Sequence, residues 1–244
     1  MSGAAGGPLG SGREPGGARL AAVFLDGDYD DPAYFRGLAE AADIVVAADG
    51  GARFLLEHGL RPHVVVGDFD SLPAADAERL EVAGVELVRH PVRKDRTDGE
   101  MAADEALRRG AGELVLAGAL GALDHTLGHL AILRRLAARG VPARLAAPQL
   151  TVRVLAAPAE ARLDAPAGTR VSIVPQYGDA LVTLEGFDYP LSRGVLPIDA
   201  CLGLGNAVVA AARILVHEGV VAAFVERGDE AFGGLSDDVR DATP

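Results

Sequence analysis

The chain has 244 residues, 49% of them hydrophobic, which is enough to bury the core of one large domain or two smaller ones. Its formal net charge of -12 argues against a broad nucleic-acid surface, and its apolar runs are far shorter than the roughly 20 residues of a membrane helix. A single cysteine, Cys201, excludes an internal disulfide and a multi-cysteine zinc site, and we expect it to be a small buried hydrophobe. The start of the chain lacks an apolar stretch resembling a signal peptide. We therefore expect a cytoplasmic protein with neither nucleic-acid nor membrane partners.

Residues 1–17 are rich in glycine and are expected to be disordered. Beyond them, short apolar runs predict buried strands at residues 19–25, 43–48, 63–67, 85–88, 113–117 and 143–147. Helices are predicted between these strands, over residues 32–41, 52–58, 73–82, 97–109 and 124–139. In the last of these helices, Leu127, Leu130, Ala131 and Leu133 are expected to face inward. This alternation predicts an α/β domain over residues 18–148, a mostly parallel sheet with helices on both faces.

The pattern changes near Gln149. Short and often alternating apolar runs, separated by proline, glycine and aspartate, are found at residues 151–155, 169–174, 180–184 and 220–225. They predict a C-terminal all-β, sandwich-like domain over residues 149–228, followed by an acidic tail over residues 229–244. The segment 206–216 is ambiguous between helix and strand, because four of its residues are β-branched.

Aspartates follow most of the predicted strands of the first domain: Asp26, Asp49, Asp68 with Asp70, and Asp124. Ligands of parallel α/β sheets bind beyond the carboxyl ends of the strands. If the extended geometry persists past Gly67, Asp68 and Asp70 point to the same side, and two converging carboxylates favour a magnesium or calcium ion. The alternative is a polar turn in which Ser71 caps the next helix.

A polar loop supplies a second cluster. Lys94 offers a cation for phosphate, and Asp98 lies in the first turn of a helix, where exposed amides attract anions. Thr97 and Glu100 fit a capping box, so Thr97 is more readily explained as a cap than as a catalytic residue. Aspartates, a lysine and helix starts around one crevice indicate nucleotide-phosphate chemistry with magnesium.

Four ordered motifs carry a resemblance to a known family. They read Asp49-Gly50-Gly51-Ala52, Gly67-Asp68-Phe69-Asp70-Ser71, Lys94-Asp95-Arg96-Thr97-Asp98 and Leu123-Asp124-His125-Thr126-Leu127. Their order and spacing over residues 20–147 resemble the thiamine pyrophosphokinase family, and the β-rich remainder resembles that family's thiamine-side domain.

The resemblance implies transfer of pyrophosphate from ATP to the hydroxyl of thiamine, giving thiamine diphosphate and AMP with Mg²⁺. It also implies a homodimer, with each site between the α/β domain of one subunit and the β domain of the other. The implied metal ligands are Asp68, Asp70 and Asp98, which count as catalytic together with Asp124 and His125. The implied binding residues are Asp49, Gly50, Gly51, Lys94, Asp95, Thr97 and Asn206.

Several alternatives stay open. Ala122 and Gly205 stand where the resemblance implies an arginine and a serine, so a related pyrophosphokinase could act on another alcohol, such as a hydroxymethylpterin. A haloacid dehalogenase-type hydrolase would explain the pairs at residues 26–28 and 68–70, although both lack the threonine or valine expected two residues later. A degenerate, non-catalytic nucleotide-binding homologue is a third alternative. Asp124 could merely cap its helix, and His125 could bond a backbone carbonyl.

Overall fold

The computed structural model describes residues 18–69, 72–91, 95–226 and 235–236. The chain divides into two compact units. The first contains the described residues up to Ile132 together with Leu145–Ala147, and the second contains Leu133–Arg144 and the described residues from Pro148 onward. The expected disorder of residues 1–17 concerns residues outside the described part. Within that part, no helix is both long enough and apolar enough to span a membrane.

The first unit is built on a parallel sheet, as predicted. Its strands pair in the order β4-β3-β2-β1-β5, with β6 beside β5, and the pairings among the first five are all parallel. The strands are β1 (Leu20–Phe24), β2 (Ile44–Ala48), β3 (Val64–Gly67), β4 (Glu86–Arg89), β5 (Glu113–Ala117) and β6 (Ala143–Ala147). The helices are α1 (Pro32–Ala41), α2 (Gly51–Glu57), α3 (Ala74–Val82), α4 (Asp98–Arg108) and α5 (Leu123–Ala138). The end of α5 and the start of β6, within residues 133–144, belong to the second unit.

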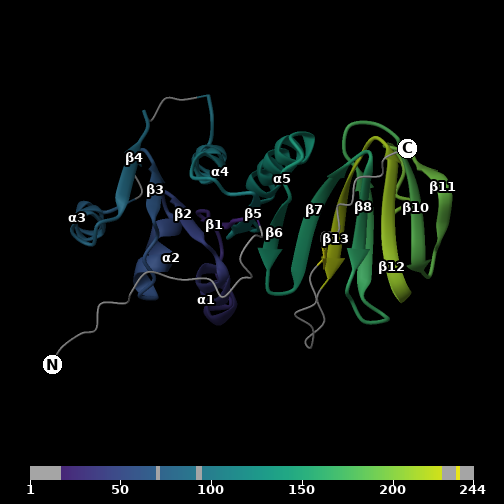
Figure 1. Ribbon diagram of the computed structural model, residues 1–244, viewed down its shortest axis with the longest axis horizontal. Helices are drawn as coiled ribbons and strands as arrows, with labels where there is room; N and C mark the ends of the chain where they lie inside the picture. Colours follow the sequence, from purple (N-terminus) through teal and green to yellow (C-terminus); the bar gives the residue numbers. More distant parts are fainter. Residues whose placement is uncertain (1–17, 70–71, 92–94, 227–234, 237–244) are drawn as a thin grey trace. The chain divides into compact units, whose positions relative to one another are not determined.

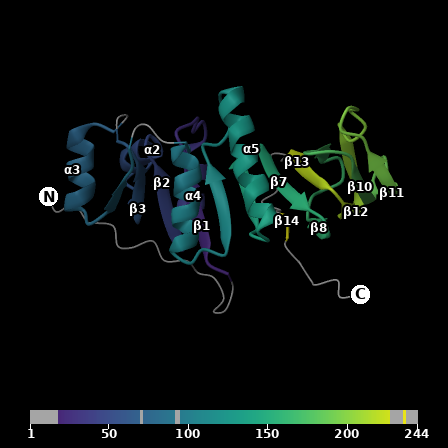
Figure 2. The ribbon, with the colours of Figure 1, turned by 90° about the horizontal axis from the view of Figure 1, so that it is seen from above.

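Helices cover both faces of this sheet (Figure 1). One core includes Phe35 of α1, Leu55 of α2 and Leu80 of α3, packed against alternate strand residues such as Phe24. Helix α4 packs across β1, β2 and β3 (Figure 2), and its Gly99 lies against Leu25, which follows Phe24 and faces the other way. The predicted α/β fold with helices on both faces is therefore confirmed.

The second unit is an antiparallel sandwich. One layer has the order β7-β13-β9 and the other β11-β10-β12-β8-β14, and β12 also joins the first layer through Asn206 and Ala207 beside β9. Apolar residues from both layers, such as Ile173 and Ile214, form one core. The strands are β7 (Leu150–Ala156), β8 (Ala159–Leu163), β9 (Arg170–Pro175), β10 (Ala180–Phe187), β11 (Leu191–Leu196), β12 (Asn206–Glu218), β13 (Val220–Glu226) and β14 (Leu235–Ser236). This confirms the predicted all-β, sandwich-like fold.

Four local expectations need correction or completion. The ambiguous segment is strand β12, because its β-branched residues pair along β10 and β8. Leu127 and Ala131 of α5 are exposed, and Leu130 and Leu133 are buried, so the predicted inward face was half wrong. Cys201 is exposed rather than buried. Part of the expected tail forms strand β14, which pairs with β8.

Candidate active site

Carboxylates stand side by side at the carboxyl ends of β1, β2 and β3. A Cβ on Gly50 would lie 2.2 Å from Oδ1 of Asp26, so the Asp26 side chain rests directly on the Gly50 backbone. A Cβ on Gly67 would lie 3.0 Å from the Cβ of Asp49, which places Asp49 over the end of β3, next to Asp68. Three neighbouring strands therefore each contribute an aspartate to one edge of the sheet.

Asp49 is held in a fixed conformation. Its φ of 38° lies in the left-handed region, which aspartate tolerates better than most residues. Its backbone N–H donates to the Val66 carbonyl at 2.9 Å, and its own carbonyl accepts from Ala52 at 3.0 Å at the start of α2. The side chain is only 6% exposed. A buried carboxylate held in this way is a poor candidate for a merely solubilising residue.

Gly51 explains why this edge can be so compact. A Cβ there would lie 2.2 Å from the Phe24 carbonyl oxygen, so α2 begins in direct backbone contact with the end of β1. The sequence predicted binding roles for Gly50 and Gly51. The structure places both beneath the aspartates, where a side chain would displace Asp26 or the strand itself.

The premise for the convergence of Asp68 and Asp70 was wrong. Strand β3 ends at Gly67, and Phe69 has a φ of 63°, so the extended alternation does not continue. A left-handed aromatic residue is strained, and such strain is concentrated at functional sites. The Phe69 ring is buried in the core, with the Arg89 guanidinium 4.6 Å from its centroid. Asp70 and Ser71 lie outside the described residues; helix α3 begins after Pro73, without a side-chain cap.

The capping box at the start of α4 is confirmed. The Thr97 hydroxyl accepts from the Glu100 N–H at 3.2 Å, and the Glu100 carboxylate accepts from the Thr97 N–H at 3.0 Å. This leaves the half-buried Asp98 in the first turn. Asp95 is exposed just before the cap, and Lys94 lies outside the described residues.

Asp124 and His125 lie in the first turn of α5, where both are exposed. Asp124 Oδ1 accepts a hydrogen bond from the N–H of His125 at 2.9 Å. The helix begins one residue earlier, at Leu123, so Asp124 is inside it rather than at the capping position. The next histidine of the helix, His129, was not predicted as a site residue, and its ring meets that of His125 edge to face with centroids 6.3 Å apart.

The donor set fits magnesium better than a softer metal. Asp68 and Asp98 offer hard carboxylate oxygens, which Mg²⁺ prefers, and no cysteine accompanies them. In the described part of the chain, no group of three or more histidine, cysteine, aspartate or glutamate side chains is arranged to hold a metal ion. The third expected ligand, Asp70, is outside that part.

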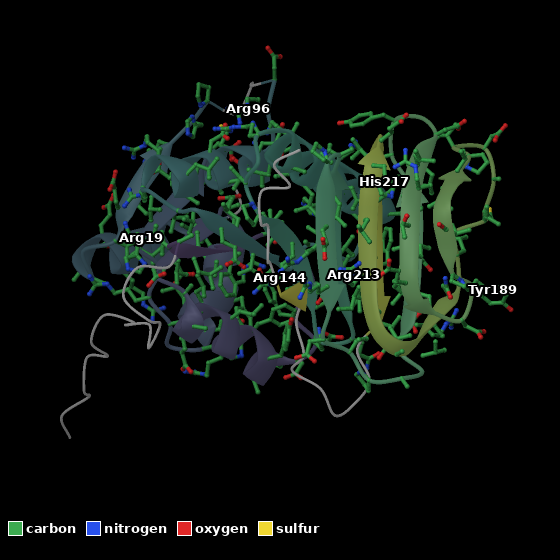
Figure 3. All side chains as sticks on the ribbon, turned by 45° about the vertical axis from the view of Figure 1, so that its right-hand side comes forward. Arg19, Arg96, Arg144, Tyr189, Arg213 and His217 are labelled. Atoms are coloured by element: carbon green, nitrogen blue, oxygen red, sulfur yellow. The ribbon has the colours of Figure 1, made fainter. Side chains whose placement is uncertain are left out.

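In the second unit, Asn206 is buried at 5% exposure at the start of β12. Its Oδ1 accepts from the N–H groups of Tyr189 and Ala207, each at 2.9 Å, and its Nδ2 donates to the Tyr189 carbonyl at 2.8 Å. Asn206 therefore clamps the backbone of Tyr189, whose side chain is 70% exposed near the turn between β10 and β11 (Figure 3). Tyr189 was not among the residues expected from the sequence, because nothing in the local pattern marks an isolated tyrosine.

A parallel α/β unit with an acidic edge, joined to an antiparallel β unit, defines a class of two-part proteins to which several solved structures belong. The structure of thiamine pyrophosphokinase from Bacillus subtilis has a TM-score of 0.74 at 23% identity, covering 86% of this chain and 100% of that one. Thiamin pyrophosphokinase from Geobacillus thermodenitrificans has a TM-score of 0.70 at 26% identity, covering 86% of this chain and 98% of that one.

Sequence comparison points the same way. Residues 35–145 match the family model described as thiamin pyrophosphokinase, catalytic domain. The curated thiamine pyrophosphokinase of Bacillus subtilis is 28% identical over 176 residues, which cover 71% of this chain and 82% of that protein. Over residues 35–145 the chain is similar to the catalytic domain of the thiamin pyrophosphokinase family, as its four motifs predicted. These relatives do not favour the dehalogenase or pterin alternatives.

Proposed function

We propose that the protein transfers the pyrophosphoryl group of ATP to the hydroxyl group of thiamine in a magnesium-dependent reaction, giving thiamine diphosphate and AMP. The observation that carries the proposal is the row of aspartates over glycine backbone at the ends of β1, β2 and β3, beside the start of α4. Similarity to the thiamin pyrophosphokinase family supports the choice of reaction.

The proposed metal ligands are Asp68, Asp70 and Asp98. Magnesium, when bound, neutralises charge on the phosphate groups, which is its usual contribution to phosphoryl transfer. Asp49 is fixed by its backbone hydrogen bonds and borders the proposed magnesium site, so it limits how the phosphates approach the ion. Lys94 and Asp95 complete the proposed phosphate end, and the N–H groups at the start of α4, capped by Thr97, add a positive dipole.

Asp124 and His125 are proposed to position the acceptor hydroxyl. Their exposure at the beginning of α5 leaves them accessible to a substrate. His125 can accept the proton that the hydroxyl loses during attack, because a neutral imidazole is a suitable base near neutral pH. Holding the hydroxyl in line with the phosphorus supplies much of the rate enhancement in such reactions.

The second unit is proposed to recognise thiamine. Tyr189 presents an exposed aromatic ring on a backbone fixed by Asn206, so the ring can stack on the heteroaromatic rings of thiamine at little cost in conformational entropy. We assign residues 18–148 to ATP and magnesium, residues 149–228 to thiamine, and residues 229–244 to a tail. We also propose a cytoplasmic homodimer in which the two parts of a site come from different subunits.

Product analysis tests the reaction. Purified protein with ATP, Mg²⁺ and thiamine should form AMP and thiamine diphosphate in equal amounts, and a chelator should stop both. Asp68→Asn should lose at least about a hundredfold in kcat, as expected when a charge-stabilising group is removed. Asp31→Asn is the matched control, since it removes the same charge, caps α1 equally well and lies outside the proposed site. Reaction of another alcohol in place of thiamine, or unchanged turnover in Asp68→Asn, would contradict the proposal.

Mixing two defective variants tests the shared site. If each site combines the α/β unit of one subunit with the β unit of the other, Asp68→Asn and Tyr189→Ala proteins should complement after subunit exchange. At a low thiamine concentration the mixture should then show more activity than either variant shows alone. A monomer in light scattering, or the absence of complementation in a dimer that exchanges subunits, would count against the proposed arrangement.

A further inference from the structure

The last residue of β4, Arg89, adds a positive charge to the edge of the sheet that carries the aspartates. Strands β1, β2 and β3 are followed by Asp26, Asp49 and Asp68, whereas β4, which lies beside β3, ends in Arg89. Because the four strands are parallel, their carboxyl ends lie at the same edge. Arg89 is exposed, so a ligand at this edge can reach it.

The side chain of Arg89 lies on the same face of the sheet as that of Asp49. Arg89 pairs with Gly67 of β3, and residues paired in register on parallel strands direct their side chains to the same face. A Cβ on Gly67 would lie 3.0 Å from the Cβ of Asp49, so Asp49 occupies that face as well. Because Gly67 has no side chain, it leaves the space between the arginine and the aspartate open to a ligand.

Phe69 holds the Arg89 guanidinium in place. The Phe69 ring is 8% exposed and packs in the core of the first unit, and the central carbon of the guanidinium lies over it, 4.6 Å from the ring centroid. The backbone is fixed too, since the N–H of His90 donates to the Gly67 carbonyl at 2.9 Å. An arginine that is already ordered loses less conformational entropy when it binds a ligand.

Among the residues that the structure describes, no carboxylate forms an ion pair with Arg89. Other arginines of this unit do pair: Arg79 with Asp76 at 3.1 Å, and Arg109 at 2.5 Å with Glu86, at the opposite end of β4. A cation–π contact engages the face of the guanidinium and leaves the N–H groups along its edge able to donate. Arg89 therefore keeps both its charge and its donors for a ligand.

The charge of this edge defines what Arg89 would bind. A polyphosphate keeps a net negative charge even with Mg²⁺, so the aspartates repel those phosphate oxygens that the metal does not contact. A guanidinium offsets this repulsion and donates two parallel hydrogen bonds to a phosphate group. Since Asp68, a proposed metal ligand, directly follows the residue that pairs with Arg89, the phosphates held by the metal would lie next to this guanidinium.

We propose that Arg89 binds the pyrophosphoryl group that is transferred in the reaction, with Phe69 holding its guanidinium toward the phosphate oxygens. The inference rests on the proposed function for the identity of this group. It adds a phosphate-binding residue on β4, opposite Asp49 across Gly67, to the cation already proposed at Lys94.

Equilibrium binding, measured by calorimetry in the absence of thiamine, tests this assignment. The probes are ATP, AMP and inorganic pyrophosphate, each with Mg²⁺. Arg89→Met removes the charge but still covers the Phe69 ring, so it should weaken ATP and pyrophosphate about tenfold, the loss expected for hydrogen bonds from a charged donor. AMP lacks the pyrophosphoryl group, so its binding should not change.

Two further variants separate the charge, the shape and the position of the side chain. Arg89→Lys keeps the charge but loses the planar pair of donors, so the loss for pyrophosphate should be smaller than in Arg89→Met. Arg79→Met is the matched control, because it removes the same charge from the last turn of α3 and should bind all three probes as the wild type does. Urea denaturation should give Arg89→Met nearly the stability of the wild type, since methionine retains an apolar contact with Phe69.

The outcomes distinguish this inference from the proposed function. Wild-type affinity for ATP and pyrophosphate in both Arg89 variants would overturn the inference, as would an equal loss for AMP or a wild type that binds neither ATP nor pyrophosphate. In the full reaction, Arg89→Met should raise the KM for ATP and leave the KM for thiamine unchanged. A protein that binds pyrophosphate through Arg89 but forms no thiamine diphosphate would count against the proposed function alone.

Discussion

His129 donates its Nδ1 hydrogen to the carbonyl oxygen of Ala119 across 2.7 Å, and so ties helix α5 to the turn that precedes it. The turn contains Gly118 at φ 66° and Gly121 at φ 153°, which have more backbone freedom than other residues. The same helix carries Asp124 and His125. One hydrogen bond therefore fixes the turn relative to two proposed catalytic residues.

This relationship predicts losses of different size for two substitutions at His129. His129→Leu leaves the Ala119 carbonyl without its donor and should lower the free energy of unfolding by about 1 to 3 kcal/mol, whereas His129→Asn retains an N–H donor and should lose less. Urea denaturation gives the stabilities. If the bond positions the site, His129→Leu should also lower kcat and His129→Asn should restore most of it. Equal kcat values in both variants would show that the contact serves stability alone.

Substitution of glycine by alanine is predicted to lower stability at position 51 and to raise it at position 37. Gly51→Ala places a Cβ 2.2 Å from the Phe24 carbonyl and should destabilise the protein by about 1 to 3 kcal/mol, because backbone must shift. Gly37→Ala, inside α1 with no atom within 4 Å of the new Cβ, should stabilise by about 1 kcal/mol through helix propensity. Thermal unfolding of both variants checks the pair. Similar melting temperatures would contradict the close backbone contact.

His63 predicts a pH dependence of stability. Partial burial lowers the pKa of His63, as does the Arg109 guanidinium, and its Nδ1 accepts the Val45 N–H at 2.9 Å, which requires the neutral ring. The contribution of neutral His63 to the free energy of unfolding is complete above about pH 6.5, the pKa of histidine in the unfolded chain. It is lost as the pH falls through the lower pKa of His63 in the folded protein. His63→Asn keeps an acceptor but cannot titrate. Unfolding free energies from about pH 8 to about pH 5 should therefore fall more steeply in the wild type, and parallel curves would refute the assignment.

Substitutions at Tyr189 and Asn206 are predicted to change the KM for thiamine more than the KM for ATP. Tyr189→Ala should raise the KM for thiamine about tenfold by removing ring stacking, and Tyr189→Phe should change it little. Asn206→Asp, which puts a carboxylate against the Tyr189 carbonyl, should act in the same direction as Tyr189→Ala. Initial rates with each substrate varied in turn separate the two KM values. A larger change in the KM for ATP than in the KM for thiamine would contradict the proposed role of Tyr189 in thiamine binding.

The sequence by itself determined the α/β unit, because each of its signals is local. Buried parallel strands give continuous apolar runs such as Leu114–Leu116, and the Thr97–Glu100 capping box is complete within four residues. The same locality explains why four short motifs were enough to reveal the similarity to a known family.

Tertiary structure alone decided how those motifs are arranged. The contacts of Asp26 with Gly50 and of Asp49 with Gly67 join residues from different strands, and no periodicity within one segment encodes them. The left-handed Phe69 overturned the alternation argument, since the backbone there follows the demands of the core. Leu127 and Ala131 were misplaced because helical spacing shows that an apolar face exists and not which part of it is covered. The backbone of Tyr189 is fixed by an asparagine 17 residues away, a relation that only the folded chain creates.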